Sequence, residues 1–146
     1  MMGLILQQGE VPGRCLCGAC RFAARPEGAA HICHCSMCRQ WTGGMFISVG
    51  LSQAPRFDDA APLGVFRSSD WGERVFCKDC GASLIWRTQD GAMNMASVQC
   101  FDDPGRFALE TEIFIDEKPA SYALAGQHQT MTGAEVMAMF APKDEG

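Results

Sequence analysis

Eight of the nine cysteines in this 146-residue chain are grouped in three short clusters, a spacing that points to metal binding. The clusters are Cys15-x-Cys17-x2-Cys20, Cys33-x-Cys35-x2-Cys38 and Cys77-x2-Cys80. Thiolates so close together on a turn can hold a soft metal ion near tetrahedral geometry with little extra ordering of the chain. Structural zinc takes four protein ligands, whereas catalytic zinc takes three and keeps one position open. Eight clustered cysteines therefore predict either two closed sites or one closed and one open site.

The third cluster has the form of a zinc knuckle. In Cys77-Lys-Asp-Cys80-Gly81, backbone N–H groups should point at the first sulfur, and the glycine permits a left-handed backbone. The knuckle supplies two ligands and needs two more from one of the earlier clusters, so that metal binding would clasp distant parts of the chain. Spacing alone does not decide which of the earlier clusters joins it.

The residues around the clusters resemble a known family. The stretches concerned are Gly13-Arg-Cys15-Leu-Cys17-Gly18, Cys33-His34-Cys35-Ser36-Met-Cys38-Arg39, Phe66-Arg-Ser68-Ser69 and Arg74-Val-Phe76-Cys77-Lys-Asp-Cys80-Gly81. In this order and spacing they are similar to the glutathione-dependent formaldehyde-activating enzyme family, which also contains centromere protein V. The resemblance implies a single zinc-binding domain over residues 1–146, with core motifs in residues 13–84, and a mainly β architecture, the β-tent fold.

The resemblance also divides the cysteines between two zinc ions. It implies a closed structural site of Cys15, Cys17, Cys77 and Cys80, and a second site of Cys33, Cys35 and Cys38 with one position open. Cys20 departs from the family pattern, in which an apolar strand residue is usual. We therefore expect Cys20 to be a small buried residue rather than a spare ligand or a redox thiol. Cys100, isolated beside Phe101, has the same interpretation.

A three-thiolate zinc with an open position suits the activation of a thiol. The cation lowers the pKa of an incoming thiol from about 8.5, so that a thiolate is present at neutral pH and can attack a small aldehyde. The resemblance implies a carbon-sulfur lyase that joins glutathione or a similar thiol to formaldehyde, or separates them; the family's product is S-hydroxymethylglutathione. Two alternatives stay open: a non-catalytic thiol-binding carrier, and a structural zinc domain that binds another protein.

We predict further roles for residues that lie beside the clusters in the sequence. Arg39 is a candidate partner for a carboxylate of glutathione, although a surface ion pair or an N–H bond to a zinc-bound sulfur is equally supported. His34 alternates with two cysteines on a chain taken as extended, so its side chain should point away from the metal and support or pack beside the site. By resemblance, three more residues line the pocket or orient the zinc loops: Ser68, Ser69 and Arg74. No motif surrounds His31 or His128, so we predict no functional role for either histidine.

Short β-like runs bounded by Gly, Pro, Asp and Ser must position these clusters. Seven runs are predicted as strands, at residues 21–24, 45–49, 65–68, 74–76, 83–86, 93–98 and 112–115. Residues 55–62 and 102–105 are predicted as loops, and no linker is long enough to divide the chain. One helix is predicted near the C-terminus, where Thr132-Gly-Ala-Glu135 matches a capping box. Its apolar stripe of Val136, Met139 and Phe140 should face the core.

Composition excludes some classes of function. Twelve basic and 17 acidic residues give a net charge of −5, which argues against a nucleic-acid partner. The N-terminal residues lack the features of a signal peptide, and no run of about 18 apolar residues occurs. We therefore expect a cytoplasmic protein without membrane contact, in which clustered cysteines bind metal rather than form disulfides. Its expected partners are a small thiol and a small aldehyde.

Overall fold

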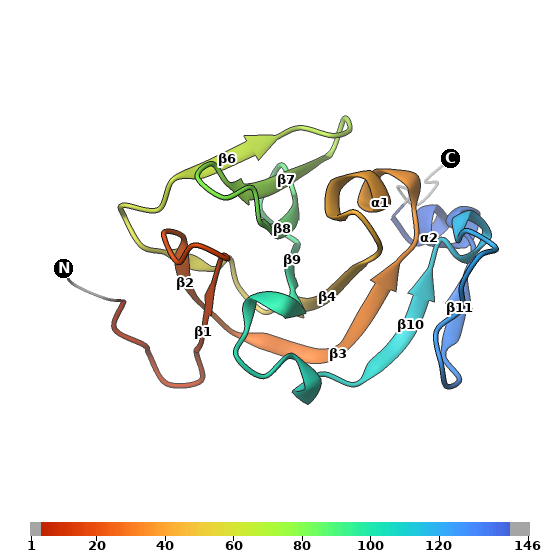
Figure 1. Cartoon of the computed structure of the whole chain (residues 1–146), viewed down its shortest axis with the longest axis horizontal. Coiled ribbons are helices and arrows are strands. Elements are labelled where there is room, and N and C mark those ends of the chain that lie inside the picture. The colour runs from red at the N-terminus through yellow and green to blue at the C-terminus, as the bar shows by residue number, and fades with distance from the viewer. Residues whose placement is uncertain (1–3, 141–146) are drawn as a thin grey trace, which may run out of the picture. The chain divides into compact units, whose positions relative to one another are not determined.

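The structure of the protein, a computed structural model, describes residues 4–140 in two compact units. Unit 1 comprises residues 4–30 and 47–108, and unit 2 comprises residues 31–46 and 109–140. The longest strand, β3 (Pro26–Cys33), begins in unit 1 and ends in unit 2 (Figure 1). No helix within the described residues is long and apolar enough to cross a membrane.

Unit 1 is built from two groups of antiparallel strands (Figure 1). The first group, in spatial order, is β1 (Val11–Arg14), β2 (Arg21–Ala24) and β5 (Arg56–Phe57). The second group, in spatial order, is β4 (Phe46–Leu51), β9 (Asn94–Ser97), β8 (Ser83–Thr88), β7 (Gly72–Cys77) and β6 (Leu63–Phe66). Two 3-10 helices follow β9: η1 (Val98–Cys100) and η2 (Pro104–Arg106).

A buried apolar core holds the strands of unit 1 together. Val75 and Ile85 are Cα partners on β7 and β8, and both are fully buried. The ring of Phe22 on β2 contacts the rings of Phe57 and Phe101, with centroids 5.1 and 5.9 Å apart. Each such side chain contributes about 1.5–3 kcal/mol when it is fully buried. This packing fixes the ends of β1 and β7, where the first and third cysteine clusters lie.

Unit 2 surrounds the end of β3 with short elements. They are α1 (Ser36–Thr42), β10 (Leu109–Ile113), η3 (Ile115–Glu117), β11 (Gln129–Met131) and α2 (Gly133–Phe140). β10 pairs with β11 in parallel, and the carbonyl of Ile113 accepts a hydrogen bond of 3.1 Å from the N–H of His34. The second cysteine cluster runs from the last residue of β3, Cys33, through the N-cap of α1, Cys35, to Cys38 in the first turn of α1.

The mainly β prediction is confirmed, and each of the seven predicted strands overlaps an observed one. The loop predicted at residues 55–62 contains the short strand β5, and residues 102–105 lead into η2. The sequence did not indicate β1, β3 or β11. β3 contains proline, glycine and two alanines, which have low strand propensity, so pairing with neighbouring strands overrides local preference there.

The C-terminal capping box is confirmed in α2. The N–H of Thr132 donates to Oε1 of Glu135 at 2.8 Å, and the N–H of Glu135 donates to Oγ1 of Thr132 at 3.2 Å. The prediction that the apolar stripe of α2 faces the core is wrong in part, because Val136 is buried but the side chain of Met139 is 65% exposed. The sequence also missed α1, whose seven residues are too few to show an apolar period.

Arg56 on β5 holds the N-terminal segment of unit 1 through hydrogen bonds to Glu10 and Ile5. Nη2 of Arg56 donates to Oε1 of Glu10 at 2.7 Å and to the carbonyl of Ile5 at 2.9 Å. Hydrogen bonds from Arg56 and from the N–H of Gln7 lower the pKa of Glu10 from 4.5 to about 2. The ionised carboxylate therefore stabilises the folded chain at neutral pH.

We expect Glu10→Gln to lower the Tm at pH 7 and the Tm difference from the wild type to shrink in acid. A lowered pKa gives stability that is complete above pH 4.5 and is lost as the pH falls toward about 2. Circular-dichroism melting across this range measures the difference. Glu27→Gln, at an exposed position of β3 without a hydrogen-bonded side chain, is the control. A Glu10→Gln difference that stayed constant down to pH about 2 would contradict the assignment.

Candidate metal centres

Four cysteine sulfur atoms converge in unit 1. They belong to Cys15, Cys17, Cys77 and Cys80, and all lie within 4.8 Å of one another. The Sγ of Cys17 is 3.6 Å from that of Cys15 and 3.8 Å from that of Cys77. A disulfide needs about 2.05 Å, whereas tetrahedral zinc with Zn–S bonds of about 2.3 Å spaces its sulfurs about 3.8 Å apart. The group therefore fits a tetrahedral metal ion and does not fit a disulfide.

Backbone N–H groups are directed at two of these sulfurs. The N–H of Cys20 donates to Sγ of Cys15 at 3.2 Å, and the N–H of Cys80 donates to Sγ of Cys77 at 3.4 Å. Burial raises the pKa of Cys15, but the hydrogen bonds from Cys20 and from the neighbouring thiols outweigh it and lower the pKa to about 6. The local backbone thus favours the thiolate, the form that binds metal.

The two remaining cysteines of unit 1 lie outside this group. Cys20 is fully buried, its Sγ donates to the carbonyl of Pro62 at 3.7 Å, and burial raises its pKa. Cys100 is also buried, donates to the carbonyl of Ser83 at 3.8 Å, and has its pKa raised to about 12 by burial. Both thiols are neutral core groups, as the sequence interpretation expected.

Three more sulfur atoms converge in unit 2. Cys33, Cys35 and Cys38 are all buried, and their Sγ atoms lie within 4.8 Å of one another. Cys35 is the N-cap of α1, where its Sγ accepts the N–H of Cys38 at 3.3 Å. Within residues 4–140, no fourth Cys, His, Asp or Glu completes this group. A tetrahedral ion held by these three sulfurs would keep one position open.

The charge of the three-sulfur group also fits a metal ion. Hydrogen bonds to Cys35 and Cys38 raise the pKa of Cys33, and burial raises it further. Three adjacent sulfurs cannot all be ionised unless a cation offsets their repulsion, and a divalent ion supplies that charge. Soft, buried thiols are a donor set that fits zinc.

His34 lies between two of these cysteines in the sequence, and its ring binds a buried carboxylate. Nε2 of His34 is 2.8 Å from Oε1 of Glu112, and Nδ1 of His128 is 2.9 Å from Oε2 of the same residue. Burial raises the pKa of Glu112, but the hydrogen bonds from His128 and His34 outweigh it and keep the pKa below its usual value. Because the carboxylate only accepts, each ring nitrogen facing it is a donor.

Sequence reasoning did not find Glu112 or identify a role for His128. Glu112 is 78 residues from His34 and 16 from His128, so no local pattern joins the three. Thr111 and Glu112 are both buried, which breaks the alternation that would mark one face of β10. His34 itself lies outside the three-sulfur group, as expected of a supporting residue.

Arg39 stabilises the turn between β3 and α1 through a hydrogen bond. Its Nε donates to the carbonyl of His34 at 3.0 Å. In the described part of the chain no carboxylate forms an ion pair with it. The structure therefore shows a structural contact for Arg39, and its binding of a substrate carboxylate stays a prediction.

Ser68, Ser69 and Arg74 form hydrogen bonds that stabilise the start of β7 in unit 1. The family resemblance predicted that these residues line the pocket or orient the zinc loops. Nε of Arg74 donates to Oγ of Ser68 at 3.1 Å, and Arg74 is buried. Oγ of Ser69 accepts the N–H of Gly72 at 3.0 Å. These bonds shape the chain that leads along β7 to Cys77.

The chain is similar to known proteins over most of its length. A family model described as glutathione-dependent formaldehyde-activating enzyme matches residues 10–117. The chain is 31% identical over 130 residues to an uncharacterized lyase of Schizosaccharomyces pombe, across 88% of this chain and 95% of that protein. A solved structure of a Rhodobacter sphaeroides protein matches with a TM-score of 0.56 and 21% identity, over 68% of this chain and 99% of that one. This last likeness is one of fold.

Replacing Glu112 tests the histidine–carboxylate network. We expect Glu112→Ala to lower the free energy of unfolding by about 1–3 kcal/mol or more, because it leaves two ring N–H groups without an acceptor. Glu110→Ala, on the same strand but exposed, should change stability by no more than about 0.5 kcal/mol. Denaturant unfolding of the metal-loaded proteins measures both. Equal stabilities of the two variants would show that the network contributes nothing.

Proposed function

The chain belongs to the glutathione-dependent formaldehyde-activating enzyme family, and from that membership we propose that it is a zinc-dependent lyase acting on carbon–sulfur bonds. The proposed reaction joins a thiol, glutathione or a similar one, to a small aldehyde such as formaldehyde, or reverses that step. One observation carries the proposal, the buried group of three sulfur atoms of Cys33, Cys35 and Cys38. Three ligands leave a tetrahedral ion one position for a substrate.

Each sulfur group would hold one zinc ion in this proposal. The four-sulfur group fits a closed structural site, and the three-sulfur group fits the reactive one. When bound at the second site, zinc lowers the pKa of a thiol at the open position from about 8.5. The three cysteines add negative charge, which keeps a substrate sulfur nucleophilic and favours thiol over water activation. Their burial also restricts water near the reacting atoms.

The proposed reaction needs no oxidant or reductant. The thiol loses its proton, and its sulfur forms a bond with the aldehyde carbon. The π bond of the carbonyl breaks, and the oxygen takes up a proton. The product is an S-hydroxymethyl thioether, and the reverse reaction releases the same two reactants.

Arg39 is the residue that we assign to a carboxylate of the substrate. Its Nε bond to the carbonyl of His34 fixes the guanidinium and leaves the two Nη nitrogens for another acceptor. Arginine binds carboxylates through such a fork. A local cation is required here, because the chain as a whole carries a net charge of −5 and glutathione is an anion.

The rate of adduct formation tests the lyase proposal. Thiols add to formaldehyde without a catalyst, so the uncatalysed rate must be subtracted. We expect the corrected rate to be proportional to the concentration of the wild-type protein and to fall at least about tenfold in Cys38→Ser, a barrier change of about 1.4 kcal/mol. Exchange spectroscopy of glutathione and formaldehyde at equilibrium measures it. Cys20→Ala, whose thiol lies outside both sulfur groups, is the matched control.

A corrected rate that did not depend on protein concentration would overturn the enzyme proposal. Glutathione titration of the same proteins then separates the alternatives. Binding that is lost in Cys38→Ser would identify a thiol carrier, whereas the absence of binding in the wild type would leave a structural zinc domain.

Metal content tests the assignment of two sites. We expect two zinc ions in the wild type and one in Cys35→Ser, which should keep its fold. Cys77→Ser should unfold or aggregate, because the four-sulfur site joins segments 60 residues apart in the sequence. Elemental analysis of the purified proteins, with circular dichroism for the fold, measures both effects. A single zinc ion in the metal-replete wild type would contradict the scheme.

A further inference from the structure

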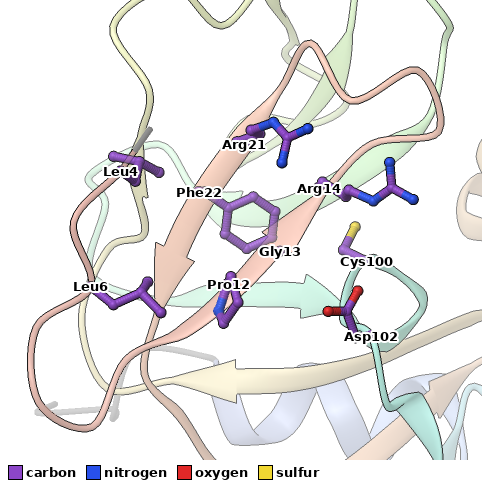
Figure 2. A pocket seen from close by; sticks show the side chains of 9 residues that line it. All are labelled: Leu4, Leu6, Pro12, Gly13, Arg14, Arg21, Phe22, Cys100 and Asp102. Atoms are coloured by element: carbon purple, nitrogen blue, oxygen red, sulfur yellow. The ribbon is translucent and has the colours of Figure 1, made fainter. Parts of the chain in front are cut away.

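A cavity of about 340 Å³ lies wholly within unit 1 and shares no residue with either sulfur group (Figure 2). Small-molecule pockets in proteins begin at about 300 Å³. The N-terminal segment and the β1–β2 hairpin supply most of its lining, and Cys100, the last residue of η1, completes it together with Asp102. The Glu10–Arg56 pair described above holds the N-terminal segment in place.

One side of the cavity is apolar. The ring of Phe22, which is 1% exposed, lies across the hairpin because Gly13, its Cα partner on β1, has no side chain. A Cβ on Gly13 would lie 2.4 Å from Cζ of Phe22, so any larger residue would displace the ring. Leu4, Leu6 and Pro12 extend the apolar lining beside it (Figure 2). Leu4, Leu6 and Pro12, rather than the buried ring of Phe22, offer the accessible apolar surface that can receive a hydrocarbon group.

Two arginines line the cavity next to the apolar side. Arg14 and Arg21 are Cα partners on β1 and β2. Their guanidinium nitrogens come within 3.6 and 3.4 Å of the position of a Cβ on Gly18, so both groups converge over the same glycine. Like charges directly opposite each other destabilise a strand pair. In the part of the chain that the structure describes, neither side chain forms an ion pair or a hydrogen bond.

The remaining lining groups limit the charge of a ligand. Asp102 adds one carboxylate to the lining, which therefore carries one negative and two positive side chains and is only weakly positive. Cys100 adds no charge, because burial raises the pKa of its thiol to about 12. Such a lining favours one negative charge and disfavours a dianion.

We propose that this cavity binds a small amphipathic monocarboxylate. Arg14 and Arg21 hold its carboxylate, which relieves their mutual repulsion, and Leu4, Leu6 and Pro12 receive its hydrocarbon chain. The proposal rests on unit 1 alone and does not depend on the lyase reaction assigned to the three-sulfur group.

Hexanoate is the probe for this site. Two further compounds separate the contribution of the carboxylate from that of the hydrocarbon chain. Hexanol has the chain without the charge, and inorganic phosphate has the charge without the chain. We expect hexanoate to shift the amide resonances of Gly13 and Gly18 in the zinc-loaded protein in a saturable way. Hexanol and phosphate should each bind at least about tenfold more weakly, since each loses one of the two contributions.

Arg14→Gln and Arg21→Gln should each weaken hexanoate binding at least about tenfold. Arg67→Gln, at a side chain that is 71% exposed and outside the cavity, should leave it unchanged. Hexanol or phosphate binding as tightly as hexanoate would overturn the proposal, as would the absence of a saturable shift. The comparison of the three compounds uses the wild-type protein, so it decides the question even if an arginine variant does not fold.

Discussion

Sulfur atoms that repel one another when they are ionised lie close together in both units, and the rest of the structure depends on how this repulsion is balanced. In unit 2 the hydrogen bonds to Cys35 and Cys38, together with burial, raise the pKa of Cys33 and so oppose the ionisation of its thiol. In unit 1 the backbone N–H of Cys20 offsets the repulsion in part by favouring the thiolate of Cys15. A divalent cation in each group would balance this charge and would convert repulsion between chain segments into a bond between them.

The two units surround their sulfur groups with different kinds of packing. The large apolar cluster, with residues such as Phe22, Val75 and Ile85, belongs entirely to unit 1, where it orders the strand ends that carry cysteines. Unit 2 lacks a cluster of that size among its described residues and places a buried polar network there instead, with Glu112 between two histidines. Polar networks contribute less free energy than apolar cores but fix geometry more narrowly. This suits a site with one open position.

The sequence predicted the parts of this arrangement that are encoded locally. Cysteine spacing and the capping box at Thr132 are short patterns, and the flanking motifs gave the family and the four-plus-three division of cysteines that the sulfur distances now fit. The pairing of β3 and the carboxylate of Glu112 depend on residues far apart in the sequence. Single-sequence periodicity does not carry such information, and seven residues of α1 are too short to show any.

The loop that carries Cys15 and Cys17 is also the turn of the β1–β2 hairpin, closed by a hydrogen bond of 3.0 Å from the N–H of Cys15 to the carbonyl of Cys20. The same hairpin sets Arg14 opposite Arg21. A metal ion in the four-sulfur group and an anion between the arginines would therefore stabilise one element, and their binding would be thermodynamically linked. By reciprocity, a carboxylate in the cavity would raise the affinity of the four-sulfur group for its metal by the same factor as the metal raises the affinity of the cavity for the carboxylate.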